Sequence, residues 1–98
     1  MTKKTLCDVE RMLRRYPMLQ DMRSLRLRRW REAIDDTLAE FEQTGAVEKA
    51  GLLTRHYFDG SPARETLEAL HISRRTYYSY KHDVLCTAAF HAAKRGLL

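Results

Sequence analysis

Apolar residues recur every three or four positions along most of this 98-residue chain, and this spacing predicts amphipathic helices. One helix is expected at about residues 6–15, a second from a start between residues 17 and 24 to residue 43, and a third at residues 46–58. Two more follow residue 61. No segment alternates convincingly between apolar and polar residues, and only four glycines and two prolines interrupt the chain. The pattern therefore predicts an all-α fold.

Residues 61–93 have the pattern of two helices joined by a very short turn. Ser61 is expected to be the N-cap of the first helix and Pro62 its first residue, where the missing N–H costs nothing. Leu67 and Leu70 lie three apart on one face, which predicts a short amphipathic helix. Two such helices at the C-terminal end predict a helix-turn-helix.

The second helix of this pair is predicted to start after Ser73 as its N-cap and to cover about residues 74–94. Its apolar edge has helical spacing and consists of Thr76, Tyr77, Tyr80, Val84 and Ala88 or Phe90. We expect Tyr77 in the core, Tyr80 partly buried and Tyr78 exposed. The outward face is cationic and rich in hydrogen-bond donors: Arg74, Arg75, Tyr78, Ser79, Lys81 and His82.

The second helix of a helix-turn-helix lies in the DNA major groove with its N-terminal residues nearest the base edges. The predicted DNA-binding residues are Arg64, Arg74, Arg75, Thr76, Tyr78, Ser79, Lys81 and His82. Arginines at the start of the helix suit base edges, whereas Lys81 and Arg64 are expected to contact phosphates.

The segment ETLEALHISRRTYYSYK resembles the pattern E-I-A-x-x-L-G-I-S-x-x-T-V-x-x-Y of sigma factor region four and its relatives. Leu70, Ile72, Ser73 and Thr76 match it outright. The tyrosine-rich helix, with YFDG before it, is similar to the corresponding segment of small phage transcriptional regulators of the ArpU and RinA kind. The resemblance covers residues 57–85. It implies a sigma region-four-like domain with an extra N-terminal helical part, which activates late or downstream phage or mobile-element genes from a promoter-proximal site.

Two residues depart from that pattern. Leu67 replaces a small alanine, which asks for a slightly wider gap between the two helices. His71 replaces the turn glycine, so a residue other than glycine must adopt the turn conformation, and histidine is one of the residues that tolerate this.

In the N-terminal half, Thr5 and Asp8 form a predicted capping box for the first helix, and Pro17 predicts a break after it. The helix that ends at residue 43 has a heptad-like apolar stripe: Leu27, Trp30, Ile34, Leu38 and Phe41, with Thr37 in one seam position. Arginines crowd its first half and acidic residues its second half, which opposes the helix dipole. An antiparallel second copy would relieve both, so these residues are predicted to form a homodimer seam. Alternatively, the stripe packs on the first helix and the helix-turn-helix.

Along residues 46–58, Val47, Ala50, Leu53 and Tyr57 are expected to share the side that covers the helix-turn-helix, before an end at Asp59-Gly60. The chain is thus expected to be a single compact domain with two parts. Residues 1–45 form an N-terminal helical part with the dimer seam, and residues 46–98 form the DNA-binding part.

Charge varies along the chain, which carries a net charge of +5. Residues 1–31 contain ten basic and three acidic residues, residues 32–68 three and nine, and residues 71–98 five and one. This order favours DNA at one end and something else at the other. Cys7 and Cys86 are expected to be reduced thiols, and the chain shows neither a transmembrane segment nor a signal peptide, so we expect a cytoplasmic protein.

Enzymatic motifs are missing from the sequence: it has no G-x-G-x-x-G, Walker, H-E-x-x-H or nucleophile-elbow pattern. His82 and Cys86 lie one helical turn apart, but a metal site would need further ligands, so we expect no metal, no cofactor and no enzymatic activity. The expected function is sequence-specific binding of double-stranded DNA in transcription regulation. The alternatives are an oligomer like the small subunit of a phage terminase, and an interaction module that docks on RNA polymerase.

Overall fold

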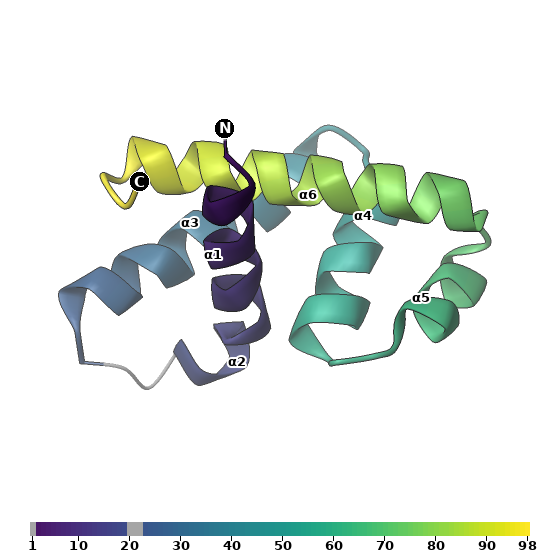
Figure 1. The fold of residues 1–98 in the computed structure, drawn as a ribbon, viewed down its shortest axis with the longest axis horizontal. Helices are drawn as coiled ribbons and strands as arrows, with labels where there is room; N and C mark the ends of the chain where they lie inside the picture. The colour runs from purple at the N-terminus through teal and green to yellow at the C-terminus, as the bar shows by residue number, and fades with distance from the viewer. Residues whose placement is uncertain (1, 20–22) are drawn as a thin grey trace.

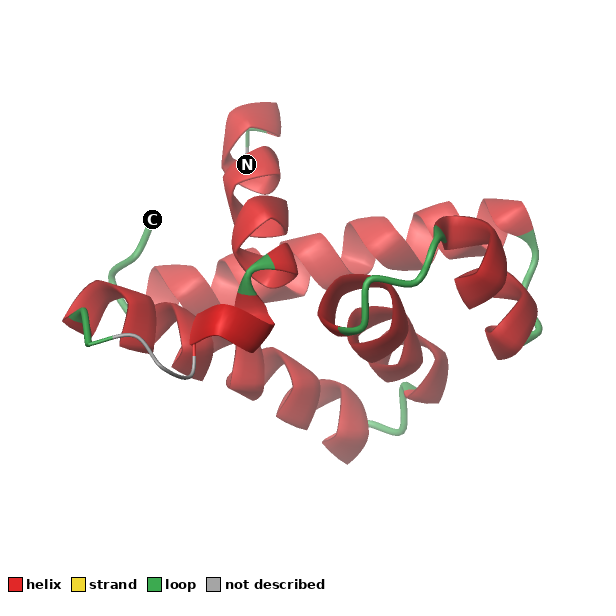
Figure 2. Ribbon diagram, turned by 90° about the horizontal axis from the view of Figure 1, so that it is seen from below, coloured by secondary structure: helices red, strands yellow, loops and turns green. Residues whose placement is uncertain are grey.

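The structure, a computed structural model shown in Figure 1, describes residues 2–19 and 23–98. Figure 2 shows helices joined by loops, with no strand in these two ranges. In chain order the elements are α1 (Lys3–Arg14), α2 (Tyr16–Leu19), α3 (Leu25–Gln43), α4 (Val47–Leu52), η1 (Leu53–Phe58), α5 (Ala63–Leu70) and α6 (Arg74–Lys94). The predicted all-α fold is confirmed.

The long helix α6 is the element on which both halves of the chain pack. It contacts α1, α3 and α4, and in Figure 1 it lies across one side of the molecule. Fully buried side chains from both halves form one cluster, which includes Leu13 of α1, Ile34 of α3, Leu53 of η1, and Tyr77 and Val84 of α6. One core therefore joins residues 1–45 to residues 46–98.

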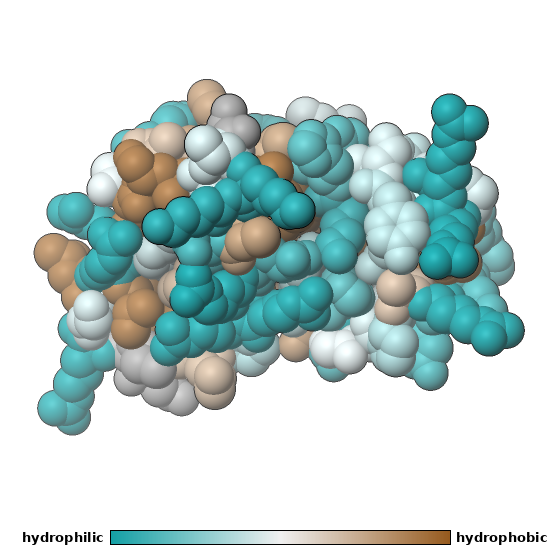
Figure 3. All heavy atoms as spheres, in the orientation of Figure 1, coloured by the Kyte–Doolittle hydropathy of each residue, from teal (hydrophilic) through white to brown (hydrophobic). Residues whose placement is uncertain are grey.

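Apolar surface remains at one end of the molecule. Figure 3 shows apolar side chains at the end where the C-terminus and the start of α3 lie, with hydrophilic side chains between them. Leu25 and Leu98 are 59% and 51% exposed. The helix α5 lies at the opposite end (Figure 1).

The first helix starts earlier than predicted. Thr2 is the N-cap of α1, and its Oγ1 accepts a hydrogen bond of 3.2 Å from the N–H of Thr5. Thr5 is therefore helical, and Asp8 forms an ion pair with Arg11 instead of completing a capping box. Because Thr2 and Thr5 offer the same capping chemistry, the spacing alone did not separate them.

The predicted break near Pro17 is present, but it lies at Arg15, the C-cap of α1. Tyr16 was expected outside a helix. Instead it begins the single turn of α2, with Pro17 in that turn, where a missing N–H leaves no bond unmade. The Tyr16 ring stacks on Phe58 with ring centroids 4.0 Å apart. The next helix, α3, ends at Gln43, as predicted.

The predicted dimer seam on α3 is wrong, because its stripe is covered within one chain. Trp30, Ile34 and Phe41 are 5%, 1% and 4% exposed, and Leu27 and Leu38 are partly buried against the same core. The helices α2, α4 and α6 pack on α3 and cover these side chains. The seam residue Thr37 is buried too, and its hydroxyl donates to the carbonyl of Ala33 at 2.8 Å. Of the alternative, packing on the second helix of the predicted pair is present through α6, whereas the other main neighbours of the stripe are α2 and α4 rather than the first helix.

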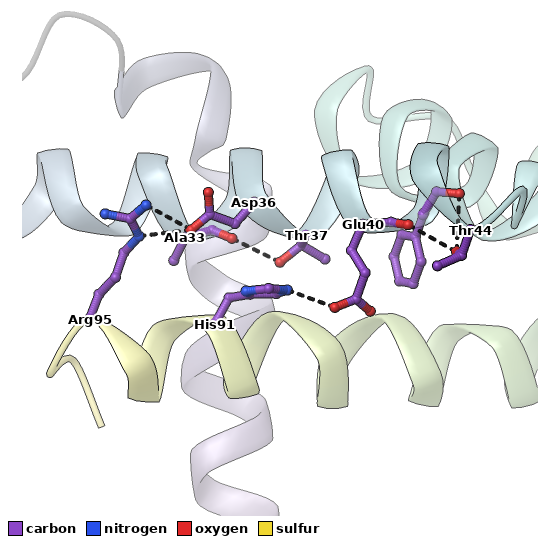
Figure 4. Close-up of polar contacts among 8 residues, drawn as sticks. Ala33, Asp36, Thr37, Glu40, Thr44, His91 and Arg95 are labelled. Atoms are coloured by element: carbon purple, nitrogen blue, oxygen red, sulfur yellow. Dashed lines mark hydrogen bonds and ion pairs between the residues drawn. The ribbon is translucent and has the colours of Figure 1, made fainter.

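The acidic half of α3 is neutralised by the end of α6, which runs antiparallel to it (Figure 4). Arg95 contacts Glu32 at 2.5 Å and Asp36 at 2.7 Å, and His91 Nε2 lies 3.0 Å from Glu40 Oε1. The opposite charges that were expected from a second copy therefore come from the same chain.

The helix predicted at residues 46–58 is α4 continued by η1, a π-helical segment. The N–H of Asp59 donates to the carbonyl of Thr54, five residues earlier, at 2.9 Å. Leu53 and Tyr57 are buried as predicted, but Val47 is 71% exposed. Successive helical residues are about 100° apart, so Val47 lies about 120° from Leu53 and was wrongly placed on its face.

Candidate nucleic-acid interface

The helix α5 begins one residue later than predicted. Pro62 is its N-cap rather than its first residue, and the Ser61 side chain does not cap it. Thr66 is buried instead, and its hydroxyl donates to the carbonyl of Pro62 at 3.0 Å. Leu70 packs over Gly51 of α4 so closely that a Cβ atom there would lie 2.6 Å from Leu70 Cδ2. These contacts fix α5 on its neighbours α4 and η1.

The turn between α5 and α6 is a tight cap at the end of α5. His71 has a left-handed backbone, with φ 55° and ψ 42°, in agreement with the turn role predicted for a residue other than glycine. Its N–H donates to the carbonyl of Glu68, and the N–H of Ile72 donates to that of Leu67, both at 3.2 Å. This is a Schellman arrangement, in which the partly buried Leu67 and Ile72 come close together. These two backbone hydrogen bonds therefore fix the direction in which α6 leaves α5.

The start of α6 is the one predicted. Ser73 has an extended backbone, and its Oγ accepts a hydrogen bond of 3.1 Å from the N–H of Thr76. The helix then continues for 21 residues to Lys94. Tyr77 is fully buried and Tyr80 partly buried, as predicted. The orientation of the first two turns of α6 is thus set by a cap and a core tyrosine.

Most of the predicted DNA-binding side chains of α6 lie on one exposed face. Arg74, Arg75, Tyr78, Ser79 and His82 are all exposed. They stand at positions i, i+1, i+4, i+5 and i+8, a spacing that keeps side chains on one side of a helix. The Arg74 guanidinium carbon lies 5.9 Å from the centre of the Tyr78 ring, within the range of a cation–π contact. The face presents cations and hydrogen-bond donors without a carboxylate among its members.

A groove separates α5 from the start of α6. Arg74 and Tyr78 line one side, and Arg64, Leu67 and Glu68 line the other, with Ala63. Arg64 is exposed, and its Nε lies 3.4 Å from Glu68 Oε1 in an i, i+4 ion pair. The groove therefore combines a short apolar wall, which includes Leu67, with charged edges.

Lys81 does not belong to the exposed face, which counts against the predicted phosphate contact. Its Nζ lies 3.2 Å from Glu10 Oε2 of α1, and the side chain is only 25% exposed. The sequence could not indicate this, because the partner lies 71 positions away and only the packing of α1 on α6 brings it close. Thr76, also in the predicted set, is partly buried, with its hydroxyl 2.9 Å from Ser73 Oγ.

A polar cluster that the sequence did not predict joins α1, η1 and α6 behind this face. Tyr57 Oη donates to Glu10 Oε2 at 2.7 Å, and Arg14 Nη2 lies 3.6 Å from the same oxygen, to which Lys81 is also paired. Burial by itself would raise the pKa of Glu10. The hydrogen bonds from Tyr57 and Lys81, with the charges of Lys81 and Arg14, outweigh it and lower this pKa below its ordinary value.

His56 and Tyr77 are buried side by side next to this cluster, with ring centroids 6.0 Å apart. His56 Nδ1 donates to the carbonyl of Ser61 at 2.8 Å, whereas His56 Nε2 and Tyr77 Oη have no hydrogen-bond partner in the described ranges. Burial lowers the pKa of His56, and the charges of Arg14 and Lys81 act in the same direction. The fold therefore favours the neutral form of this ring.

His82 and Cys86 contact each other, with 3.5 Å between Nε2 and Sγ. In the part of the chain that the structure describes, no cluster of three or more His, Cys, Asp or Glu side chains could hold a metal ion. Both Cys7 and Cys86 are free.

The described helices include none that is long and apolar enough to cross a membrane. Comparisons with protein-family models, with curated proteins and with solved structures found no match for this chain.

Proposed function

We propose that this protein binds double-stranded DNA sequence-specifically as a transcription regulator in the cytoplasm, without enzymatic activity. In this proposal α5, its turn and α6 act as a helix-turn-helix, with the start of α6 in the major groove. The observation that carries the proposal is the exposed face of Arg74, Arg75, Tyr78, Ser79 and His82 on a capped, core-anchored helix. The resemblance to sigma region four and to phage regulators supports it and suggests phage or mobile-element genes as targets.

The chemistry of this face matches what the major groove offers. The groove is about 12 Å wide and accepts one α-helix, and guanine presents two acceptors there that an arginine fork can bind together. Arg74 and Arg75 carry such forks in the first turn of α6, the part of a recognition helix that lies nearest the bases. Tyr78 and Ser79, one turn later, can donate to bases or to the phosphates at the groove wall.

The distribution of neighbouring charges supports the same orientation. No acidic residue lies in the first turn of α6. Glu68, across the groove, forms an exposed ion pair with Arg64, which weakens its repulsion of an approaching phosphate. With Lys81 bound to Glu10, the phosphate contacts of α6 fall to Tyr78, Ser79 and His82, and those of α5 to Arg64.

Selection of binding sites from random duplexes by the purified protein, followed by footprinting at about 150 mM salt, tests the proposal. A defined preferred site is expected, with an affinity that falls steeply as salt rises. Dyad-related half-sites spaced by whole helical turns would show that two copies bind.

Variants locate the contact. Arg74→Ala with Arg75→Ala should lower affinity for the selected site at least about tenfold, since each good arginine–guanine pair is worth about 1–3 kcal/mol. The matched control is Arg28→Ala with Arg29→Ala, which removes two exposed arginines from α3. Equal losses in both double variants would indicate unspecific attraction to a basic protein. If no sequence is enriched from the random duplexes, the proposed function is wrong.

A further inference from the structure

A cleft lies between α1, the start of α3 and the C-terminal tail, at the end of the molecule opposite α5 (Figure 1). Three arginines line it: Arg11 and Arg15 from α1 and Arg26 from α3. Asp8 is the one acidic side chain among its lining residues, and it is paired with Arg11. The rim of the cleft is therefore cationic.

Apolar side chains form the rest of the lining. Met12, Leu27, Trp30 and Leu97 are buried or partly buried there, and Leu98 is 51% exposed at the edge. Leu25, 59% exposed, stands next to Arg26 on α3. Figure 3 shows this end of the molecule as apolar patches between hydrophilic side chains. A cleft of this kind has room for an apolar side chain between cations.

The two halves of α3 differ in how their charges are compensated. Arg95 and His91 of α6 pair with the acidic half, as described above. The basic half has no such partner: within the described residues, no ion pair joins Arg26, Arg28, Arg29 or Arg31 to a carboxylate, and Arg15, the C-cap of α1, has none there either. Arg26 makes only a long hydrogen bond of 3.5 Å to the carbonyl of Leu97. The helix dipole adds positive potential at this end of α3, where the first turn contains no acidic residue.

We infer that this cleft binds an acidic, amphipathic helical segment of a partner protein. Leucine-like side chains of the segment would pack on the exposed Leu98 and the partly buried Leu27, above the buried Trp30, while its carboxylates would meet Arg15 and Arg26. Charge complementarity selects this occupant: Arg15 and Arg26 have no carboxylate partner among the described residues and so can pair with an anionic ligand, and the apolar lining favours aliphatic side chains on the same ligand. A DNA backbone supplies the first but not the second. This inference does not depend on the proposed function of α6.

Trp30 is the only tryptophan of the chain, so its fluorescence reports directly on the cleft. The probe is a tryptophan-free synthetic helix of about 16 residues with leucines at i, i+3, i+4 and i+7 and glutamates elsewhere. Two matched peptides replace the leucines with serine or the glutamates with lysine. We expect the acidic leucine peptide to change Trp30 emission saturably with one peptide per protein, and the other two peptides to bind at least tenfold more weakly.

Arg15→Gln with Arg26→Gln should weaken binding of the acidic leucine peptide at least tenfold, whereas Arg28→Gln with Arg29→Gln, outside the cleft on α3, should leave it within twofold. Circular dichroism establishes that both variants are folded. The inference is overturned if the leucine peptide fails to bind, or if the serine peptide binds equally well. It is also overturned if a DNA duplex produces the same Arg15- and Arg26-dependent change of Trp30 emission. A dimer of the unaltered protein in sedimentation that is lost in the variant with Arg15→Gln and Arg26→Gln would also overturn the inference, because a second copy would then occupy the cleft.

Discussion

The hydroxyl of Tyr57 on η1 donates to the carboxylate of Glu10 on α1 at 2.7 Å, across 47 positions of sequence. Lys81 of α6 reaches the same carboxylate oxygen, so three elements meet at one glutamate. This meeting point adjoins the face of α6 proposed to contact DNA, because Lys81 stands about two helical turns after Arg74. Its loss should loosen the packing that orients α6.

Removal of the Tyr57 hydroxyl should be destabilising. Tyr57→Phe leaves Glu10 with one donor fewer, and we expect the free energy of unfolding in urea to fall by about 1–2 kcal/mol. Tyr77→Phe is the matched control, since the buried Tyr77 hydroxyl has no partner in the described ranges. That change should be neutral or stabilising by up to about 1 kcal/mol. Similar losses in both variants would show that the Tyr77 hydroxyl is bonded after all.

Stability should fall on acidification through His56. Its pKa is lowered in the fold, so below about pH 6.5 the unfolded chain takes up the proton more readily than the folded one. The stability that His56 contributes is fully present above about pH 6.5 and is lost progressively as the pH falls toward the pKa of His56 in the folded protein. Glu10, whose pKa is also lowered, adds a second loss only below about pH 4.3.

Urea unfolding at pH 7.5 and pH 5.5 measures the effect of His56. His56→Asn keeps a side-chain donor for the carbonyl of Ser61 but does not titrate, so its stability should change less between the two pH values. The other three histidines are present in both proteins and cancel in the comparison. An equal change in both proteins would assign the pH dependence to groups other than His56.

The left-handed backbone of His71 should make glycine the better residue at this turn. Left-handed backbone costs an ordinary L-residue about 1–2 kcal/mol, and the greater freedom of glycine in the unfolded chain offsets part of this. We expect His71→Gly to raise the free energy of unfolding by about 0.5–1 kcal/mol. Gly45→Ala makes the opposite replacement, of glycine by an L-residue, at a second position with positive φ (75°), and should lower the free energy of unfolding. A loss of stability in His71→Gly would mean that the imidazole makes a contact worth more than the strain.

The Ser73 cap links stability to the proposed DNA contact. Ser73→Ala leaves the N–H of Thr76 without its acceptor, and we expect a loss of about 1 kcal/mol in unfolding free energy. The first turn of α6 should then fray, which weakens binding to the selected DNA site in a mobility-shift assay. Ser73→Asn restores an N-cap acceptor and should recover both properties. If it recovers stability alone, the Ser73 hydroxyl itself contacts DNA.

Arg95 should anchor the far end of α6. Arg95→Met removes the pairs with Glu32 and Asp36, and since these groups are partly exposed we expect a loss of about 1 kcal/mol at low salt. The loss should shrink in 1 M sodium chloride. Lys94→Met, next to it but without an ion pair among the described residues, should change stability by less than about 0.5 kcal/mol. A salt-independent loss would point to packing of the Arg95 stem rather than to charge.

Local patterns in the sequence predicted α6 well. A serine cap, the helical spacing of its apolar edge and a buried Tyr77 are properties of short stretches, and the structure has all of them. The turn at His71 was also predictable, because few residues adopt a left-handed backbone and histidine is one of them.

What local patterns could not supply is the identity of the neighbour. The stripe on α3 shows that a helix face must be covered, but it is the same whether α6 or a second copy covers it. Lys81 has the same spacing from the exposed residues as a phosphate-binding lysine would, and only the position of α1 turns it toward Glu10. The widened turn of η1 is likewise a result of packing, with no signature in residues 53–58.

The length of α6 has a mechanical consequence. A helix of 21 residues is a rod about 31 Å long, so a tilt of about 5° at its C-terminal end displaces its first turn by almost 3 Å. Hydrogen bonds to base edges tolerate only a fraction of that displacement. The Arg95 pairs and the Glu10 cluster hold this helix at its far end and at Lys81, so residues far from Arg74 and Arg75 would set how these two side chains meet DNA under the proposed function.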